Sequence, residues 1–303
     1  MALRVVVLGR GAWGTTLSGL WSRSGHTVVG WSRRDGGDPA ALLPGCDLAV
    51  AAVSMAGIES LARGLAPHWP PQLPLLSCSK GLDPIRLCTA SQLWGHHLRH
   101  TPLLVLSGPN LAEELRLGLP AASVLASGDA ELARRLQAEL SSDNLRLYTN
   151  ADPIGVEAAG ALKNVMALAA GVCDGLGLGA NARASLLCRG LAELGVVVRG
   201  MGGDPATTYG LAGLGDLLAT ATSALSRNYR CGLLLAEGCP EPEAIERIGA
   251  TVEGCATARA VLQLAARQDW HLPICEQVVA ILEGRTPPPA AVAALMERQL
   301  KSE

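Results

Sequence analysis

The stretch that decides the fold reads RVVVLGRGAWGTTL, at residues 4–17. Three valines and a leucine follow its first residue, and such a run predicts a strand over residues 4–8 that is buried on both faces of a parallel sheet. Apolar residues then recur at helical spacing over residues 12–24. Residues 27–31 have the pattern of a second strand. The sequence therefore begins with a βαβ unit.

The turn between this strand and this helix has the spacing Gly-x-Gly-x-x-Gly, at Gly9, Gly11 and Gly14. In such a turn the glycines allow a tight bend, close approach of the backbone to a pyrophosphate, and close packing of helix on strand. The helix N-terminus then faces the anion. A glycine-rich turn without a ligand is the alternative, but the flanking strands and helix favour a dinucleotide site.

The residues after the second strand bear on the choice of cofactor. An acid in this place commonly accepts hydrogen bonds from an adenosine ribose. Here Ser32, Arg33 and Arg34 come first, and two arginines with a serine could bind the 2′-phosphate of NADP(H). Asp35 could still accept a ribose hydroxyl of NAD(H), and the arginines could form a solvated basic turn. We predict NADP(H) as the favoured cofactor and NAD(H) as a possible one.

The remaining sequence divides into two parts. Up to about residue 150, short apolar runs alternate with helical patterns, which predicts a doubly wound parallel sheet. Beyond it, helical patterns follow one another and no clear strand remains. We predict an α/β fold with a Rossmann-like NAD(P)-binding domain at residues 1–158 and an all-α substrate and catalytic domain at 159–303. The expected later strands lie at 47–53, 73–78, 103–107 and 122–126, and the expected helices at 57–67, 83–95, 129–141, 154–172, 182–200, 213–221, 228–237, 257–268 and 273–283.

Composition excludes several classes of protein. The 303 residues are 49% hydrophobic and 17% charged, which excludes a disordered chain. The net charge of −2 is too small for the basic surface that nonspecific nucleic-acid binding needs. Arg, Asp, Gly or Pro interrupts every apolar stretch before the roughly 18–20 residues that a bilayer requires, so we expect no membrane insertion. Nine cysteines without a CxxC pair are typical of reduced thiols, and we predict a cytoplasmic location.

Three histidines form the only pattern that suggests a metal. His96, His97 and His100 could share a helix face, but no second cluster of ligands accompanies them. We therefore interpret them as surface residues and predict no metal site.

Two lysines are candidates for catalysis. Lys163, beside Asn164, lies in an apolar, alanine-rich helical pattern, where desolvation and nearby cations would lower its pKa toward that of a useful general base. A lysine that extends to solvent is the alternative. Lys80 follows an expected strand, at the carboxyl edge where open α/β sheets bind ligands, although it could be a solvated loop residue.

Two further segments have the composition of a phosphate or substrate site. Glycines cluster over residues 210–216 and would let the backbone approach a ligand; Asp216 at its end could orient a lysine or cap a helix. Residues 226–228 read Ser-Arg-Asn and open an expected helix, where a hydroxyl, a guanidinium and backbone N–H groups would meet a phosphate. The alternative for this triplet is a helix cap beside an exposed arginine.

With these features in order, the chain resembles the bacterial-type NAD(P)-dependent glycerol-3-phosphate dehydrogenases over nearly its whole length. The run at 210–216 and the Gly-Ala-Asn-Ala-Arg segment at 179–183 are the most unusual of the shared stretches. The others are residues 9–15, 79–82, 107–109, 112–114, 155–165, 226–228 and 252–254.

The resemblance implies reversible hydride transfer between a nicotinamide and C2 of sn-glycerol 3-phosphate, which gives dihydroxyacetone phosphate. It implies that Lys163 exchanges the proton of the C2 oxygen, with Lys80 and Asp216 beside it. It also implies a role in supplying glycerol 3-phosphate for phospholipid synthesis, and a homodimer. The implied substrate contacts are Lys80, Gly108, Asn110, Lys163, Asp216, Ser226, Arg227 and Asn228, and the implied cofactor contacts are Gly9, Gly11, Ala12, Trp13, Gly14, Arg33, Arg34, Lys80, Ala112, Arg227 and Glu253.

The chain departs from the family pattern after its second strand. The family usually has a helix and a loop there, whereas only residues 35–46 precede the third strand here, which would open the adenosine side or the substrate entrance. Two other functions stay open: a related hydroxy-acid dehydrogenase, and a catalytically silent NADP(H)-binding sensor. The Ser-Arg-Asn triplet argues against an unphosphorylated substrate, and the joint presence of Lys80, Lys163 and Asp216 argues against a sensor.

Overall fold

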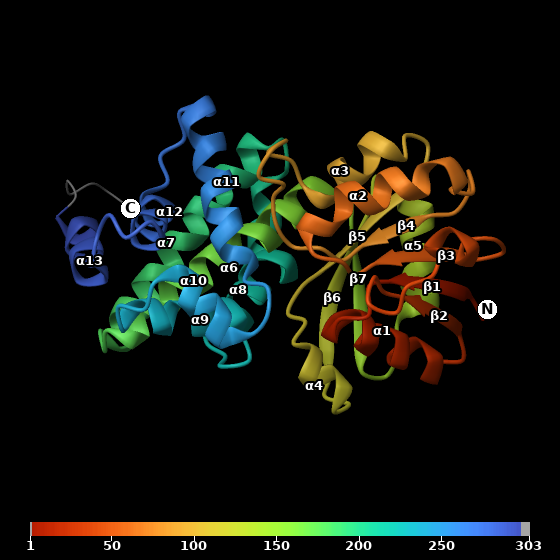
Figure 1. The fold of residues 1–303 in the computed structure, drawn as a ribbon, viewed down its shortest axis with the longest axis horizontal. Coiled ribbons are helices and arrows are strands. Elements are labelled where there is room, and N and C mark those ends of the chain that lie inside the picture. The colour runs from red at the N-terminus through yellow and green to blue at the C-terminus, as the bar shows by residue number, and fades with distance from the viewer. Residues whose placement is uncertain (1, 298–303) are drawn as a thin grey trace.

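The computed structural model describes residues 2–297, which form a sheet with helices on both faces and, beside it, a helical part (Figure 1). The described residues contain one seven-stranded sheet, with strand order β2-β1-β3-β4-β5-β6-β7. The order reverses between β1 and β3, and open α/β sheets bind ligands at the carboxyl ends of the strands beside such a reversal. The strands are β1 (Arg4–Leu8), β2 (Thr27–Trp31), β3 (Leu48–Ala51), β4 (Leu75–Ser77), β5 (Leu103–Ser107), β6 (Ala121–Ala126) and β7 (Leu145–Asn150).

One pair of strands differs from the predicted parallel sheet. β6 runs antiparallel to β5, and β7 then lies parallel to β6, while every other neighbouring pair is parallel. The sequence analysis did not predict β7. Leu145 and Leu147 are buried there whereas Arg146 is exposed, so this edge strand lacks the continuous apolar run of the others.

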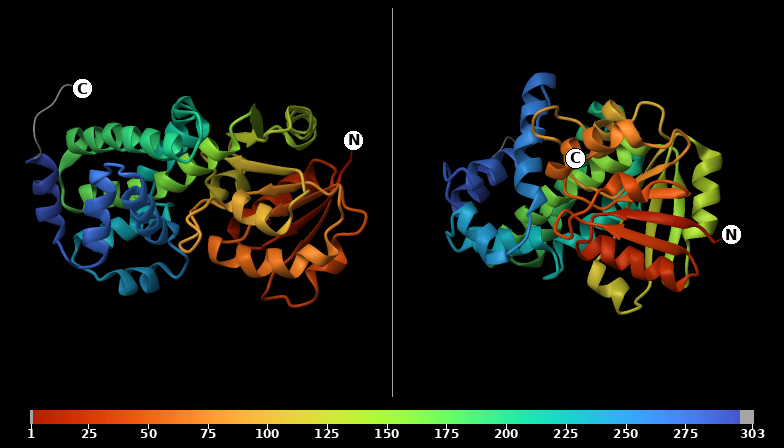
Figure 2. Two further views of the ribbon diagram at one scale, coloured as in Figure 1. Left: turned by 90° about the horizontal axis from the view of Figure 1, so that it is seen from above. Right: turned by 45° about the vertical axis from the view of Figure 1, so that its right-hand side comes forward.

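The strand β1, which lies between β2 and β3, confirms the burial expected from its sequence. Val5 and Val7 pack into the core on one face of the sheet, and Val6 and Leu8 pack into the core on the other. Figure 2 shows the helices that cover the two faces. They are α1 (Ala12–Arg23), α2 (Met55–Leu65), α3 (Ala90–His97), α4 (Ala112–Arg116) and α5 (Ala130–Leu140), with a short 3-10 turn at Pro39–Leu42.

The helix expected over residues 83–95 begins later than predicted. The carboxylate of Asp83 accepts hydrogen bonds from the backbone N–H groups of Ile85 (3.1 Å) and Arg86 (2.6 Å), which stabilises a turn in place of a helix. Thr89 then caps α3 together with Gln92, in a capping box. Residues 78–89 therefore form an irregular segment that links β4 to α3.

The helical part is arranged around one long helix, α6 (Pro153–Gly175), which is buried from Gly155 to Cys173. The predicted domain boundary after residue 158 falls inside this helix and stays a prediction. The short α10 was not predicted, because its first residues, Glu-Pro-Glu, give a weak helical pattern. The other helices are α7 (Gly179–Gly200), α8 (Asp216–Ala221), α9 (Arg227–Ala236), α10 (Glu241–Ile248), α11 (Glu253–Gln268), α12 (Pro273–Leu282) and α13 (Pro288–Met296), with a 3-10 turn at Pro205–Tyr209 and a π-helical turn at Leu211–Gly215.

Length and composition alone would allow α6 to cross a membrane, and in the described part of the chain it is the one helix of which this is true. Gly155, Gly160 and Gly171 interrupt this helix as expected from the sequence, but its composition as a whole stays apolar enough for a span. In the structure 94% of its most apolar window is buried within the protein. This burial is typical of the core helix of a globular domain.

Glycines bring α9 unusually close to α6. A Cβ atom on Gly171 of α6 would lie 2.1 Å from the carbonyl oxygen of Tyr229, and one on Gly232 of α9 would lie 2.1 Å from that of Leu168. Both contacts are with backbone atoms, so any larger residue would force the helices apart. This contact fixes the residues at the start of α9 relative to those of α6.

Candidate active site

The glycine-rich turn lies at the carboxyl end of β1, and its three glycines differ in their surroundings. Gly9 has φ +108°, and a Cβ atom there would lie 2.4 Å from the carbonyl oxygen of Ala52. A Cβ atom on Gly14 would lie 1.9 Å from the carbonyl oxygen of Gly9. Gly11, in contrast, has no atom within 4 Å of its Cβ position. The fold therefore requires the outer glycines, whereas Gly11 leaves open space through which a ligand can approach the backbone.

A cavity of about 650 Å³ adjoins this turn. Arg33 and Arg34 line it and are exposed, and neither forms an ion pair within residues 2–297. Asp35 instead pairs with Arg10 (3.0 Å) and accepts a hydrogen bond from Ser32 (2.8 Å). These two hydrogen bonds lower the pKa of the Asp35 carboxyl. The two arginines are thus left available to an anion.

The start of α1 is anchored to its neighbours. Ala12 is exposed beside the glycine-rich turn, and Trp13 lies close to the buried thiol of Cys78. The hydroxyl of Thr16 donates to the carbonyl oxygen of Ala112 (3.2 Å), at the first residue of α4. The predicted cofactor contacts Ala12, Trp13 and Ala112 therefore lie on adjoining elements.

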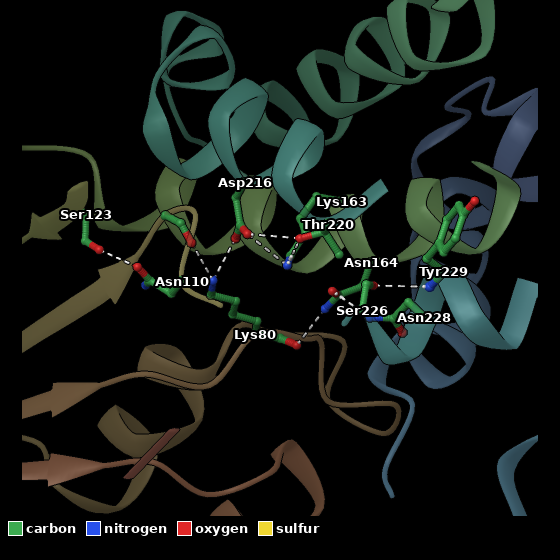
Figure 3. Close-up of polar contacts among 11 residues, drawn as sticks. Lys80, Asn110, Ser123, Lys163, Asn164, Asp216, Thr220, Ser226, Asn228 and Tyr229 are labelled. Carbon is green, nitrogen blue, oxygen red and sulfur yellow. Dashed lines mark hydrogen bonds and ion pairs between the residues drawn. The ribbon is translucent and has the colours of Figure 1, made fainter. Parts of the chain in front are cut away.

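The structure brings both candidate lysines to one carboxylate, as Figure 3 shows. Lys163 Nζ donates to Asp216 Oδ1 (3.0 Å), and Lys80 Nζ donates to Asp216 Oδ2 (2.7 Å). Lys80 Nζ also donates to the carbonyl oxygen of Gly108 (2.9 Å). Asp216 is the first residue of α8, and its side chain forms no cap there. It therefore orients the lysines, which was one of the two roles open from sequence.

Thr220 completes this cluster and was missed by the sequence analysis. Lys163 Nζ donates to Thr220 Oγ1 (2.7 Å), and this hydroxyl in turn donates to Asp216 Oδ1 (3.1 Å). Thr220 lies four residues after Asp216, so the two side chains share one face of α8. That spacing is the only signal in the sequence that could have indicated it.

Burial and neighbouring charges shift the pKa values of this cluster. Burial lowers the pKa of Lys163 to about 8, since the Asp216 carboxylate only partly opposes it and the cations of Lys80 and Arg227 add to it. Burial alone would raise the pKa of Asp216, but the two lysine ammoniums outweigh it and hold that pKa below its ordinary value. The cluster thus pairs an ionised carboxylate with a lysine that can gain or lose a proton near neutral pH.

A chain of amides connects this cluster to α9 and α11. Asn164 Nδ2 donates to the carbonyl oxygen of Lys80 (3.3 Å), and Asn228 Nδ2 donates to Asn164 Oδ1 (2.9 Å). Asn228 Oδ1 then accepts from the backbone N–H of Gly254 (2.9 Å). Both ends of the Asn228 amide are therefore occupied by protein groups. Its evident effect is to hold the start of α9 in place.

Of the other two residues of the triplet, one is buried like Asn228 and the other is exposed. Ser226 is buried and caps α9, since its hydroxyl accepts a hydrogen bond from the N–H of Tyr229 (3.2 Å). Arg227 is exposed at the first position of α9. Glu253 is half-buried; burial raises its pKa, and the charge of Arg227 and the backbone N–H of Met55 oppose that effect. Arg227 and Glu253 thus lie near each other, and Glu253 bridges to α2.

Unpartnered polar atoms mark the side of the cluster next to β5. Gly108 follows β5 with φ +134°, and Asn110 Oδ1 accepts a hydrogen bond from Ser123 Oγ (2.5 Å). Among the described residues, Asn110 Nδ2 and Ser107 Oγ are buried without a partner. Because buried polar atoms are costly unless they are hydrogen-bonded, these two donors suit a polar ligand.

Comparisons with known proteins give a consistent assignment. The N-terminal model of NAD-dependent glycerol-3-phosphate dehydrogenase matches residues 36–133, and the C-terminal model matches residues 152–293. An NAD(P)+ glycerol-3-phosphate dehydrogenase of Synechococcus sp. (strain RCC307) is 53% identical over 303 residues, which cover 100% of both chains. One of Synechocystis sp. (strain ATCC 27184 / PCC 6803 / Kazusa) is 46% identical over 301 residues, 99% of this chain and 95% of the other.

Solved structures agree with these relatives. The crystal structure of glycerol-3-phosphate dehydrogenase from Coxiella burnetii superimposes with a TM-score of 0.94 at 34% identity, over 98% of this chain and 99% of that one. A 3-hydroxyisobutyrate dehydrogenase of Mycobacterium tuberculosis reaches a TM-score of 0.52 at 12% identity, over 97% of this chain and 99% of that one, which shows a shared fold alone. By sequence, by fold and over its full length, the chain belongs to the NAD-dependent glycerol-3-phosphate dehydrogenase family.

Proposed function

We propose that this protein interconverts sn-glycerol 3-phosphate and dihydroxyacetone phosphate by NAD(P)-dependent hydride transfer. The observation that carries the proposal is the cluster in which Lys163 and Lys80 both bond to Asp216. A secondary alcohol loses a hydride from carbon and a proton from oxygen when it is oxidised. A buried lysine with a lowered pKa is suited to exchange that proton.

The residues around the first strand fit a nicotinamide dinucleotide. Gly11 and the N-terminus of α1 would hold the pyrophosphate, since no atom lies within 4 Å of the Gly11 Cβ position. Arg33 and Arg34 would bind the phosphate on the adenosine ribose, in the cavity that they line. When bound, the cofactor supplies or accepts the hydride at C2 of the substrate.

Lys163 acts as the acid or the base in this proposal. As an ammonium it donates a proton to the C2 oxygen of dihydroxyacetone phosphate, and as a neutral amine it accepts the proton of the glycerol 3-phosphate hydroxyl. Lys80 stabilises negative charge that develops on the same oxygen. Asp216 orients both lysines, and Thr220 accepts the second hydrogen bond of the Lys163 ammonium.

The substrate phosphate is recognised at the start of α9. Arg227 is exposed there, next to the cap formed by Ser226, and offers a guanidinium beside free helical N–H groups. Asn110 Nδ2 and Ser107 Oγ provide further donors near Lys80. Asn228, the next residue in α9, holds the start of this helix in place through its bonds to Asn164 and Gly254 and so fixes the backbone that carries Arg227.

We also propose a cellular setting and a quaternary structure. The reduction direction supplies glycerol 3-phosphate for phospholipid synthesis, and the protein works in the cytoplasm as a homodimer that pairs through its helical part. The nucleotide-binding domain ends near residue 158, within α6.

NADP(H) is the favoured cofactor in this proposal, and the double variant Arg33→Ala, Arg34→Ala tests it. Loss of both guanidiniums is expected to raise KM for NADPH by about 10–100-fold and KM for NADH by less than about threefold, because only NADPH carries a 2′-phosphate. Steady-state kinetics with each cofactor measures the difference. Arg135→Ala, an exposed arginine on α5 away from the cavity, is the matched control and should leave both values unchanged. Equal changes for the two cofactors would contradict the assignment.

The reaction itself is tested by following NADPH absorbance at micromolar enzyme. Dihydroxyacetone phosphate is expected to support NADPH oxidation. The kcat/KM for unphosphorylated dihydroxyacetone is expected to be lower by about 10³-fold or more, because this compound has no phosphate for Arg227 and the helix N-terminus to bind. Equal turnover of both compounds would indicate a dehydrogenase for unphosphorylated hydroxy compounds. Tight NADPH binding without turnover of either would indicate a sensor.

A further inference from the structure

A buried carboxylate on α6 contacts the segment that carries Lys80, and the proposed mechanism does not use it. Glu157 is 3% exposed and precedes Lys163 by six residues in α6, about 9 Å along the helix axis. Its Oε1 accepts a hydrogen bond from the N–H of Ser91 (2.8 Å), and its Oε2 accepts one from Ser91 Oγ (2.5 Å). Glu157 therefore lies too far from the reacting atoms to touch the substrate.

The environment of Glu157 is unfavourable for a charge. No Lys, Arg or His within residues 2–297 forms an ion pair with it. Burial raises the pKa of its carboxyl, and hydrogen bonds from Ser91 and Thr89 only partly oppose that effect. A buried carboxylate without a cation costs folding free energy, and its hydrogen bonds offset only part of that cost. Glu157 is therefore not explained by stability alone.

The segment that Glu157 holds has no regular secondary structure of its own. Residues 78–89 are irregular, and Leu87 has a left-handed φ of +54°. Leu82 and Leu87 are buried in the core that surrounds α6, although β4 and α3, which flank the segment, pack into the cores of the sheet. The conformation of this segment therefore depends on its contacts with α6.

Two polar residues of α6 fasten the two ends of this segment. Asn164 binds the carbonyl oxygen of Lys80 (3.3 Å), and Glu157 binds Ser91, which lies in α3 two residues beyond the end of the segment. The two residues are seven positions apart, so they lie on the same face of the helix. Gly160 lies between them, where a Cβ atom would be 2.7 Å from Ser107 Oγ and 3.9 Å from Lys80 Cγ. This face of α6 therefore lies close to the segment between Glu157 and Asn164.

We propose that Glu157 is a positioning residue for Lys80. Its carboxylate anchors the far end of the segment at the start of α3, while Asn164 anchors the near end, and together they keep Lys80 Nζ within reach of both Asp216 and Gly108. The inference rests on the proposed function, since the importance of the Lys80 position follows from that reaction.

Glu157→Gln tests the inference, because it keeps the shape of the side chain and one acceptor oxygen but replaces the other acceptor oxygen with an amide group that donates. We expect kcat/KM for dihydroxyacetone phosphate to fall by about 10–100-fold, with the Kd for NADPH changed by less than about twofold. The matched control is Glu193→Gln. Glu193 is 5% exposed and likewise accepts N–H groups at a helix start, from Ile274 (2.6 Å) and Cys275 (3.2 Å), but it lies on α7 and does not contact the Lys80 segment. Its variant should keep kcat/KM within about twofold.

A double-mutant cycle with Lys80→Ala separates positioning from a general structural effect. If Glu157 acts through Lys80, Glu157→Gln should change kcat/KM by less than about twofold once Lys80 is alanine. Losses that multiply in the double variant would overturn the inference. Ser91→Ala removes one of the two bonds from the other side and should show the same lack of additivity, which keeps the test open if Glu157→Gln does not fold.

Hydrogen exchange gives a second readout that does not depend on turnover. Amides in residues 79–91 should exchange about tenfold faster in Glu157→Gln and be unchanged in Glu193→Gln. A wild-type protein that does not turn over dihydroxyacetone phosphate would overturn the proposed function, whatever the exchange shows. An active wild type with unchanged exchange and unchanged kcat/KM in Glu157→Gln would overturn this inference alone.

Discussion

Lys163→Ala should lower kcat for reduction of dihydroxyacetone phosphate by about 10²–10⁴-fold while the Kd for NADPH changes by less than about threefold. Within residues 2–297 the lysine ammonium bonds to Asp216 and Thr220 alone and does not line the cofactor cavity, so its loss removes proton transfer and leaves that cavity intact. Single-turnover and steady-state kinetics with fluorescence titration of NADPH measure the two quantities. Turnover near the wild-type value would remove Lys163 from the mechanism.

Lys163→Arg is the matched control for charge. Arginine keeps a cation beside Asp216 but stays protonated throughout the accessible pH range, so it cannot accept the hydroxyl proton. Glycerol 3-phosphate oxidation should therefore stay as low as in Lys163→Ala. Recovery to within about tenfold of wild type would mean that the positive charge, and not proton exchange, is what the lysine provides.

The pKa of Lys163, lowered to about 8 by burial, sets the pH dependence of the same experiment. Oxidation needs the neutral amine, so kcat/KM for glycerol 3-phosphate should rise as the pH approaches about 8 and level off above it. Reduction needs the ammonium, so kcat/KM for dihydroxyacetone phosphate should be level below about 8 and fall above it. Inflections of opposite sense near one pH, both lost in Lys163→Arg, would assign them to this residue.

Local signals in the sequence are sufficient for the βαβ unit at the start of the fold. The strand and helix around the glycine-rich turn lie where their patterns indicate, because a buried strand and an amphipathic helix depend on neighbouring residues. The direction of a strand is not a local property. Whether β6 runs parallel or antiparallel to β5 depends on how the chain returns to the sheet, and residues 121–126 alone do not determine this direction. The weakly patterned β7 and α10 were missed for the same lack of local signal.

The active-site cluster depends on contacts that span the sequence. Lys80 and Asp216 are 136 residues apart, Lys163 and Thr220 are 57 apart, and Ser91 and Glu157 are 66 apart. The resemblance to a known family could indicate Lys80, Lys163 and Asp216, because its motifs include them. The sequence did not indicate Thr220 or Glu157, because their partners come close to them only when α8 and α3 pack against α6.

Asp216→Asn should move the inflection of the pH profiles to lower pH and reduce kcat by about 10²-fold or more. Asparagine keeps the shape of the side chain but removes the negative charge that lies 2.7 Å from Lys80 Nζ and 3.0 Å from Lys163 Nζ. Burial and the cations of Lys80 and Arg227 all lower the pKa of Lys163, and Asp216 is the group that opposes them. Without it the ammonium loses its main stabilising partner, so Lys163 deprotonates at lower pH and reduction should lose rate from below pH 8.

Asp174→Asn is the control for this last variant. Asp174 also accepts hydrogen bonds from a cation and a hydroxyl, Arg183 (2.7 Å) and Tyr229 (2.7 Å), but it does not contact either lysine. Its variant should keep the inflection near pH 8, because the charge removed lies outside the cluster. An inflection that stays near 8 in Asp216→Asn as well would show that the carboxylate does not control the protonation of Lys163. The lysine would then owe its lowered pKa to burial and to the cations of Lys80 and Arg227 without opposition from Asp216, and Asp216 would act only as a steric support for the two ammonium groups.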